Sequence, residues 1–449
     1  MFFIKDKNFY QTLFKMLIIV AMQNLVAYSV NMIDNIMLGS YSQAALSGAA
    51  TVNQVFFMVQ QVALSIGNTL IVITSQYWGE QRVDPIRSLT WHSLKLGIGT
   101  SAGILAVCFL FPVQLLQIFT SSDAIIAEGL VYLDLIKWTF PLFILSNILI
   151  SALRSVQTVA ISFYISVISL IVNAGINYTL IFGRFDFPEM GIRGAAVGTL
   201  TARILELLII IIYLLFFDKK LELNKHAVSR IDAGLKRDYW KSFVPIAMAQ
   251  ILWGISVPMQ TAILGHLSDD AIAANSVATT FYQYLKVIVI AMSSVSSVMT
   301  GNTIGRGDRE KVKAAGRTLS VIDVGIGLTL GLILFLLRDP LLSMYDLTPS
   351  ASVMDRNLIA IMSIIMVGMS YQMPVSSGVI QGSGDSKFTL KMNLISTWLI
   401  VMPLSFLTAF VLKWPVEAVV FVIQSDQIFK GLPTFLRFRS YNWIHKLTN

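Results

Sequence analysis

Residues 31–39 read Asn-Met-Ile-Asp-Asn-Ile-Met-Leu-Gly, and residues 257–265 read Val-Pro-Met-Gln-Thr-Ala-Ile-Leu-Gly, so one pattern occurs twice without a gap. The two copies stay aligned further along the chain, where Gly-Glu-Gln-Arg at 79–82 corresponds to Gly-Arg-Gly-Asp at 305–308. Each copy lies in a long apolar segment. We therefore predict a membrane protein that arose by duplication.

The composition places the chain in a lipid bilayer. Of its 449 residues, 55% are hydrophobic and only 13% are charged, and the mean hydropathy is +0.71. A soluble domain needs more polar surface than this to cover its core. An integral membrane protein is the class that remains.

Apolar segments long enough to cross the hydrocarbon region, about 20 residues each, occur about twelve times, six in each half. They lie near residues 12–37, 46–75, 89–113, 126–150, 157–183, 190–217, 241–265, 271–300, 315–337, 357–380, 386–412 and 414–437. The predicted fold is all-α, with twelve transmembrane helices in two pseudo-symmetric six-helix bundles.

The basic residues predict the orientation. Most of the 33 Lys and Arg fall at the N-terminus and in every second loop, and cytoplasmic loops retain such positive charge. We therefore expect a multi-pass protein of the inner (plasma) membrane with both termini in the cytoplasm. The basic segment 218–241 is predicted to be a cytoplasmic linker between an N-terminal lobe, 1–217, and a C-terminal lobe, 242–449.

Several classes of partner and energy source are disfavoured. The net charge of +8 needs no nucleic acid, because anionic lipid of the inner leaflet suffices. The first apolar segment is long and contains Asn24 and Asp34, so we expect a retained helix and not a signal peptide. Cys108 is the only cysteine, and no Gly-x-x-x-x-Gly-Lys-Ser/Thr phosphate loop occurs. We expect no metal and no cofactor, and transport driven by an ion gradient.

The acid of the first repeat is the leading candidate for coupling to that gradient. Asp34 corresponds to Gln260 in the second repeat, and Asn31 lies three positions earlier on the same helix face. Burial disfavours the ionised form of a carboxyl, so an isolated intramembrane acid can carry a proton. The alternative is an acid at the outer interface that meets water or caps the short 40–44 loop.

Two amides offer partners for this acid. Asn173 and Asn177 are four residues apart, so both project from one face of the fifth predicted helix. They are predicted to hydrogen-bond Asp34 across the first bundle. The alternative is that each serves only as a contact between helices.

Three further charged residues of the predicted spans are candidates for the site. Arg203 and Glu206 are three residues apart, and we interpret them first as a structural ion pair, with Glu206 as a second proton carrier as the alternative. Lys286 corresponds to Gln60 in the first repeat. If it faces a cavity, it favours anionic or neutral ligands; the alternative is a contact with helix-end carbonyls or with Asp323.

Gly-Ser-Gly-Asp at 382–385 matches a short pattern of intramembrane aspartyl proteases, whose chemistry needs two carboxyls. No second acid lies at a matching depth in the preceding helix. Asp385 is therefore interpreted as a loop and helix-cap residue, and we do not expect an enzyme.

The duplication, Asp34 followed by Leu-Gly at 38–39, and Trp-Gly-Glu at 78–80 echoed by Ile-Gly-Arg at 304–306 together resemble the multidrug and toxic compound extrusion (MATE) family. The glycine-rich stretch 191–199 is similar to the family's entry to helix 6. The resemblance implies a V-shaped pair of six-helix lobes, a central cavity that opens alternately to each side, and export of organic molecules in exchange for H⁺ or Na⁺.

The resemblance also implies roles for particular residues. Asp34 matches the family's acid on helix 1, and Asn173 with Asn177 match its polar pair on helix 5. The helices at 244–263 and 357–380 contain no Asp or Glu, although one branch of the family has acids there. This departure counts against a C-terminal Na⁺ site and favours coupling to H⁺ through Asp34.

The implied substrates are small organic compounds, often cationic and amphipathic, carried by a monomer in contact with membrane lipids. Polar side chains of both halves are candidates for the substrate cavity or for secondary coupling: Asn31, Gln60, Thr199, Arg203, Glu206, Gln260 and Lys286. The alternative function is a flippase for a lipid-linked glycan or cell-wall precursor, in which Lys286 and Arg203 would cradle phosphates.

Overall fold

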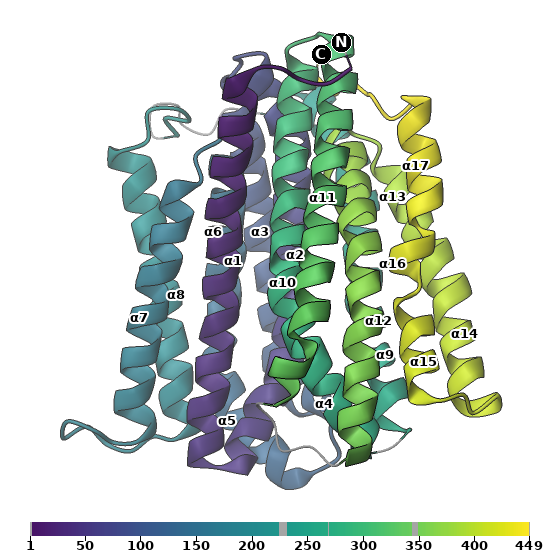
Figure 1. Ribbon diagram of the computed structural model, residues 1–449. Coiled ribbons are helices and arrows are strands. Elements are labelled where there is room, and N and C mark those ends of the chain that lie inside the picture. Colours follow the sequence, from purple (N-terminus) through teal and green to yellow (C-terminus); the bar gives the residue numbers. More distant parts are fainter. Residues whose placement is uncertain (1, 224–230, 268, 344–348, 449) are drawn as a thin grey trace. The chain divides into compact units, whose positions relative to one another are not determined.

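The computed structural model describes residues 2–223, 231–267, 269–343 and 349–448. Within these ranges the chain is all-α and contains no strand (Figure 1), so the predicted fold class is confirmed. Inside a bilayer every backbone N–H and C=O must be paired within the protein, and a helix achieves this within a single segment. Part of the predicted basic linker, residues 224–230, lies outside the described residues.

The helices of the first half alternate with short connections. They are α1 (Lys7–Tyr41), α2 (Gln43–Gly79), α3 (Asp84–Leu110), α4 (Pro112–Gln117), α5 (Asp123–Ile136), α6 (Thr139–Ser155), α7 (Ala160–Ile181) and α8 (Ile192–Phe216).

The second half includes three π-helical segments, labelled η. Its elements are α9 (Ala233–Gly265), α10 (Asp269–Gly305), α11 (Arg309–Leu342), α12 (Pro349–Met373), η1 (Pro374–Ile380), α13 (Ser386–Asn393), η2 (Leu394–Val401), α14 (Met402–Phe406), η3 (Leu407–Val411), α15 (Val416–Gln424), α16 (Asp426–Phe429) and α17 (Gly431–Ser440).

The spans agree with the sequence prediction except at two places. Among the described residues, ten helices are long and apolar enough to cross a membrane. The predicted span 126–150 is instead the pair α5 and α6, bent by 50°. Pro141 follows this bend, and it has no N–H to bond the carbonyl one turn earlier, so the helix breaks before it.

The predicted span 414–437 is not one helix but the succession of α15, α16 and α17. Turns at Ser425 and Lys430 separate the three pieces. Asp426 and Lys430 bring two charges into this segment, and their buried contacts are described below. Charged side chains are rare within spans because each one requires a partner.

The chain divides into two compact units. The C-terminal unit consists of Met1–Ala21, Ser75–Gln81 and Val244–Asn449, and the N-terminal unit consists of Met22–Thr74 and Arg82–Phe243. Helices α1, α2 and α9 therefore each contribute to both units. The division into lobes 1–217 and 242–449 stays a prediction.

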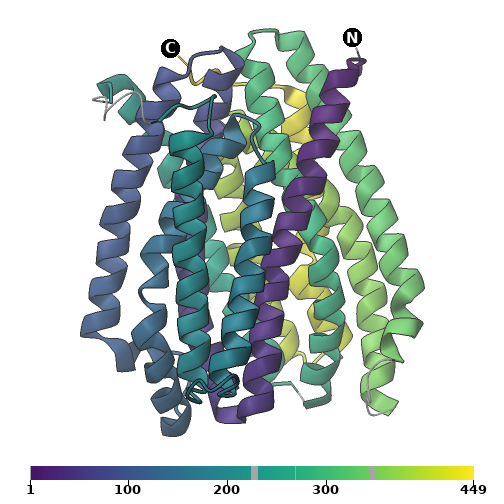
Figure 2. The same ribbon diagram turned by 90° about the vertical axis from the view of Figure 1, so that its left-hand side faces the viewer.

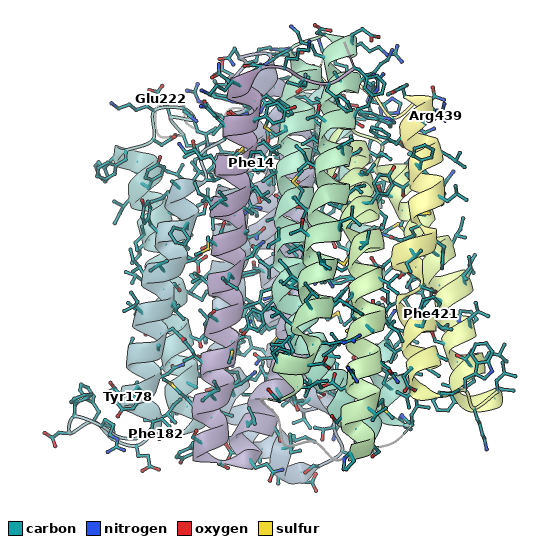
Figure 3. The ribbon with its side chains drawn as sticks, in the orientation of Figure 1. Phe14, Tyr178, Phe182, Glu222, Phe421 and Arg439 are labelled. Atoms are coloured by element: carbon teal, nitrogen blue, oxygen red, sulfur yellow. The ribbon has the colours of Figure 1, made fainter. Side chains whose placement is uncertain are left out.

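In the N-terminal unit, α7 and α8 pack along one another, and α6 packs on both α3 and α8. Figure 3 shows Tyr178 and Phe182 at one end of the α7–α8 pair and Glu222 at the other. The outward side of α8 carries exposed Leu208, Ile212 and Phe216. An apolar exposed face of this kind suits contact with lipid.

In the C-terminal unit, α10, α11 and α12 pack around a core that includes Met362, Met366 and Met369. Both chain ends lie at the same end of this unit in Figures 1 and 2. Arg317 of α11 links them, because its guanidinium donates to the Tyr441 hydroxyl at 2.8 Å and to the Phe2 carbonyl at 3.4 Å.

The two repeat motifs singled out in the sequence meet in this unit. A Cβ atom at Gly79 would collide with the Asn302 carbonyl, and one at Gly305 would collide with the Gln76 carbonyl. The backbones of α2 and α10 therefore touch where residues 78–80 and 304–306 cross. Glycine at both positions permits this close approach.

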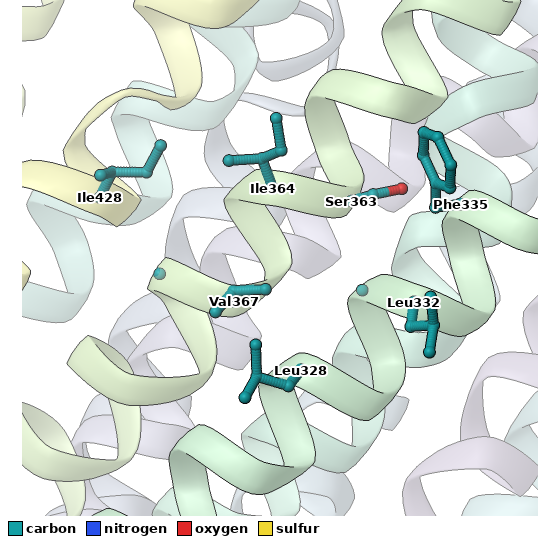
Figure 4. A pocket seen from close by; sticks show the side chains of 9 residues that line it. Leu328, Leu332, Phe335, Ser363, Ile364, Val367 and Ile428 are labelled. Carbon is teal, nitrogen blue, oxygen red and sulfur yellow. The ribbon is translucent and has the colours of Figure 1, made fainter.

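A shallow apolar groove runs along the outer face of α11 and α12, with Ile428 of α16 at one edge (Figure 4). Its exposed side chains include Leu328, Leu332 and Ile364, and Ser363 is the one hydroxyl residue in its lining. A groove with this lining suits a lipid acyl chain and lacks the polar groups that orient a specific ligand.

Candidate functional site

The centre of the candidate site is the carboxyl of Asp34 in the C-terminal half of α1. Its side chain is only 9% exposed, and its Oδ1 accepts a hydrogen bond of 2.6 Å from the Nδ2 of Asn177 on α7. This short contact joins two helices that are far apart in the sequence. The structure thus brings together the acid and one of the amides that the sequence singled out.

The hydrogen bonds continue from Asn177 into the interior of the N-terminal unit. Asn177 Nδ2 also contacts Asn173 Oδ1 at 3.3 Å, and Asn173 Nδ2 donates to the Thr199 hydroxyl on α8 at 3.2 Å. The buried Tyr132 of α5 lies close to Thr199. One chain of polar groups therefore runs from Asp34 through α7 and α8 to α5.

Small residues on α8 make room for this chain. A Cβ atom at Gly198 would collide with the Oδ1 of Asn177. Both asparagines are almost completely buried, and Asn177 Oδ1 has no hydrogen-bond partner among the described residues. The position of the Asn177 amide is thus set by the glycine behind it and the carboxylate in front of it.

A positive charge that influences Asp34 belongs to Arg203 on α8. It acts electrostatically on Asp34, but its NH1 lies 2.6 Å from Glu206 Oε2, and its guanidinium lies 5.0 Å from the ring centre of Phe143. The Arg203 charge is therefore already compensated by Glu206. Asp34 keeps an amide, and not a cation, as its direct partner.

The remaining predicted site residues lie apart from this chain of hydrogen bonds. Asn31 is exposed on α1, and Gln60 is half-buried on α2. Gln260 and Lys286 are half-buried on α9 and α10 of the C-terminal unit. Lys286 lies 5.6 Å from the ring centre of Trp253. The alternative contact with Asp323 is not made, because the Asp323 carboxyl has no hydrogen-bond partner among the described residues.

Sequence reasoning missed two features of the interior. Tyr132 gave no signal, since a lone tyrosine in an apolar run is ordinary. Asp426 and Lys430 did give a signal, because they are four residues apart in a predicted span, as an ion pair on one helix face would be. Their side chains lie 2.6 Å apart and are buried.

Asp385 lies at the predicted place, the N-cap position of α13, but its carboxyl does not cap the helix. Asp385 precedes α13 but makes no side-chain cap hydrogen bond, and its Oδ2 instead lies 2.7 Å from Arg437 NH2 of α17. The described residues contain no group of three or more His, Cys, Asp and Glu side chains placed to hold a metal ion.

Long apolar helices that cross a membrane, with a buried carboxyl hydrogen-bonded between two of them, are the features of a multi-pass membrane transporter. The MatE family model matches residues 20–179 and 245–407, most of the chain. The chain therefore belongs to the MatE family, the multidrug and toxic compound extrusion transporters.

Curated relatives agree with this assignment over nearly the whole chain. The probable multidrug resistance protein NorM of Thermotoga maritima is 26% identical over 424 residues, which cover 94% of this chain and 90% of that protein. The uncharacterized transporter YisQ of Bacillus subtilis is 23% identical over 417 residues, 92% of this chain and 90% of that protein.

Solved structures share the fold. The Vibrio cholerae MATE transporter VcmN in its bent form superposes with a TM-score of 0.85 at 17% identity, covering 98% of this chain and 99% of that one. A MOP superfamily transporter from Pyrococcus furiosus gives a TM-score of 0.85 at 15% identity, covering 96% and 95%. The predicted architecture of twelve transmembrane helices agrees with these structures.

Proposed function

We propose that this protein exports small organic compounds, often cationic and amphipathic, by antiport with H⁺, and that Asp34 carries the proton. The observation that carries the proposal is the buried Asp34 carboxyl with the Asn177 amide 2.6 Å away. The names of its relatives, multidrug resistance proteins NorM and MdtK, support the substrate class. Membership of the MatE family supports transport itself.

The chemistry around Asp34 favours H⁺ over Na⁺. Hard cations prefer several oxygen ligands. The direct partner of Asp34 is an amide nitrogen, which is a donor and repels a cation. A carboxyl needs only burial to take up a proton, and Asp34 is buried. Proton coupling therefore needs only the buried Asp34 carboxyl, whereas Na⁺ binding would need several oxygen ligands around it.

The mechanism follows from the hydrogen bond. In the ionised state, the Asp34 carboxylate accepts from Asn177 and holds the outer half of α1 against α7. Protonation removes the charge that strengthens this bond, so α1 and α7 are held together less firmly. Substrate and proton must prefer different conformations, because a ligand with equal affinity for both states shifts neither.

The test is substrate-dependent proton release from acidified inverted vesicles. Wild-type protein is expected to release protons when an organic cation is added outside, and Asp34→Asn is expected to abolish the release. Asp134→Asn is the matched control, since Asp134 is an exposed acid of the same unit that pairs with Lys137 at 2.7 Å. Release that persists in Asp34→Asn, or flux that appears only under a Na⁺ gradient, would rule the proposal out.

A flippase for a lipid-linked glycan or cell-wall precursor is the second candidate. The half-buried cation Lys286 favours it, because an ammonium group in the protein interior suits a phosphate group. Arg203 contributes less than the sequence suggested, because Glu206 already neutralises it. Rescue of glycan assembly in a flippase-deficient strain, without protection against organic dyes, would favour this candidate.

The proposal also covers the location, orientation and oligomeric state of the protein. We place it in the plasma membrane as a monomer surrounded by lipid, with both termini in the cytoplasm and two lobes joined by the basic segment 218–241. The distribution of Lys and Arg supports this orientation.

A further inference from the structure

The C-terminal unit contains a buried ion pair that the proposed proton site does not use. Asp426 and Lys430 are 6% and 5% exposed, and Lys430 Nζ lies 2.6 Å from Asp426 Oδ2. Both lie in the segment α15–α17, within the predicted span 414–437. Charges at such a depth are expensive and mark functional or tightly paired sites.

Neighbouring side chains form hydrogen bonds with both members of this ion pair. Asp426 Oδ1 accepts from Gln427 at 2.9 Å, and Oδ2 accepts from the Thr397 hydroxyl at 3.4 Å. Lys430 Nζ also donates to Asn393 Oδ1 at 3.1 Å. We call these five residues the C-terminal polar cluster. Its single acid and single cation cancel, and their hydrogen-bonding groups are occupied.

Lys286 lies near this cluster but outside its pairing. It is half-buried on α10, and Asp426 acts on it electrostatically, yet the two make no ion pair. Its ammonium faces the ring of Trp253 on α9 at 5.6 Å. Lys286 makes no hydrogen bond or ion pair with any other described residue. A cation over an aromatic face gains only part of what a carboxylate partner would supply.

Lys286 and the C-terminal polar cluster together therefore carry a net positive charge. Lys286 and Lys430 supply two positive charges, and Asp426 supplies one negative charge. We propose that Lys286 binds the carboxylate of the transported compound, while the ring of Trp253 contacts the apolar body of the same molecule. This inference rests on the proposed export of cationic, amphipathic compounds and narrows the substrate class to those that carry one carboxylate beside their cationic group.

The chemistry of the site favours a carboxylate over a phosphate group. One unpaired ammonium matches one negative charge, whereas a phosphate carries up to two and is usually bound by several cations or by a planar Arg fork. The Asp426 carboxylate nearby would oppose a second negative charge. A single carboxylate leaves Lys286 and the C-terminal polar cluster neutral together.

A matched pair of dyes tests this inference. The probes are a xanthene dye with a free benzoate and the methyl ester of the same dye, and the measurement is fluorescence polarisation with purified protein. A charge-assisted bond at Lys286 predicts that the free acid binds about tenfold more tightly than the ester. Lys286→Gln is expected to remove this preference, and Lys286→Arg is expected to keep it.

The control is Lys137→Gln, which removes a buried lysine of the other unit and should leave the preference unchanged. Unaltered binding of the ester shows that each variant is folded. Equal affinity of the wild type for both dyes, no binding of the free acid, or a preference that survives in Lys286→Gln would overturn the inference. Equilibrium binding needs no proton gradient, so Asp34→Asn should abolish export and leave the preference intact, which separates the two proposals.

Discussion

At the scale of single residues, the Asp34 site depends on a glycine that touches neither the proton nor the substrate. A methyl group at Gly198 would collide with Asn177 Oδ1, so Gly198→Ala is expected to push the amide away from Asp34. Loss of a hydrogen bond to a charged group predicts about a tenfold loss of proton-coupled export, measured in vesicles. Gly175→Ala is the matched control, because a Cβ there has nothing within 4 Å although it lies between Asn173 and Asn177.

The double variant separates this cause from general damage. If Gly198→Ala acts only through Asn177, then adding it to Asn177→Ala should cause little further loss, since residues that act through one contact are not additive. A full additional tenfold loss in the double variant would mean that Gly198 has another role. Thermal melting of each purified variant reports whether the fold is retained.

How much of this site the sequence predicts depends on spacing. Asp34 is recognisable because it is an acid in an apolar helix, and the i, i+4 spacing of Asn173 and Asn177 places both amides on one face. The sequence does not reveal Tyr132, since its contact with Thr199 joins two separate helices. The sequence also does not reveal that Asn31 is exposed. Helical periodicity shows that Asn31 and Asp34 share a face of the helix, but it does not show which part of that face is covered by other helices.

At the scale of elements, α11 begins with a capping residue whose effect depends on pH. Asp308 accepts a hydrogen bond of 3.1 Å from the backbone N–H of Lys311, and this bond holds the pKa of the Asp308 carboxyl below its usual value. A lowered acid pKa contributes stability above the unfolded value of about 3.9 and loses it as the pH falls through the folded value. Asp308→Ala is therefore expected to lower the melting temperature at pH about 7, with a smaller difference below about 4.

Asp308→Asn supplies the comparison for this cap. Asparagine is as good an N-cap as aspartate but does not titrate, so this variant should melt near the wild type at neutral pH and should lack the acid-dependent loss. Melting curves in detergent over a series of pH values measure both effects. A deficit of Asp308→Ala that stays constant down to pH about 3 would contradict a role for the charged cap.

Elements also show where sequence prediction fails. Ten predicted spans are single helices or helices continued by π-helical segments, because a long apolar run with paired backbone groups has few alternatives. The segment 414–437 differs, since it carries the buried Asp426 and Lys430 and breaks into three short helices around them. Hydropathy averages over a window and does not register a charge pair that the rest of the unit neutralises.

At the scale of the whole molecule, the orientation in the membrane can be tested with the protein's own cysteine as background. Cys108 is the only cysteine, and it is 2% exposed, so the wild type should not react with a membrane-impermeant maleimide. Arg184 is exposed in the connection between α7 and α8, and Arg309 is exposed at the start of α11.

Because α11 carries Arg317, which binds Phe2 and Tyr441, the end of α11 near Arg309 is also the end that holds both chain termini. In intact cells we expect Arg184→Cys to be labelled and Arg309→Cys to be protected, with both labelled once the membrane is opened, as the positive-inside rule requires. Labelling of Arg309→Cys in intact cells would reverse the orientation and place both termini outside. Asp34 would then lie in the cytoplasmic half of α1 and could not take up its proton from the outer side.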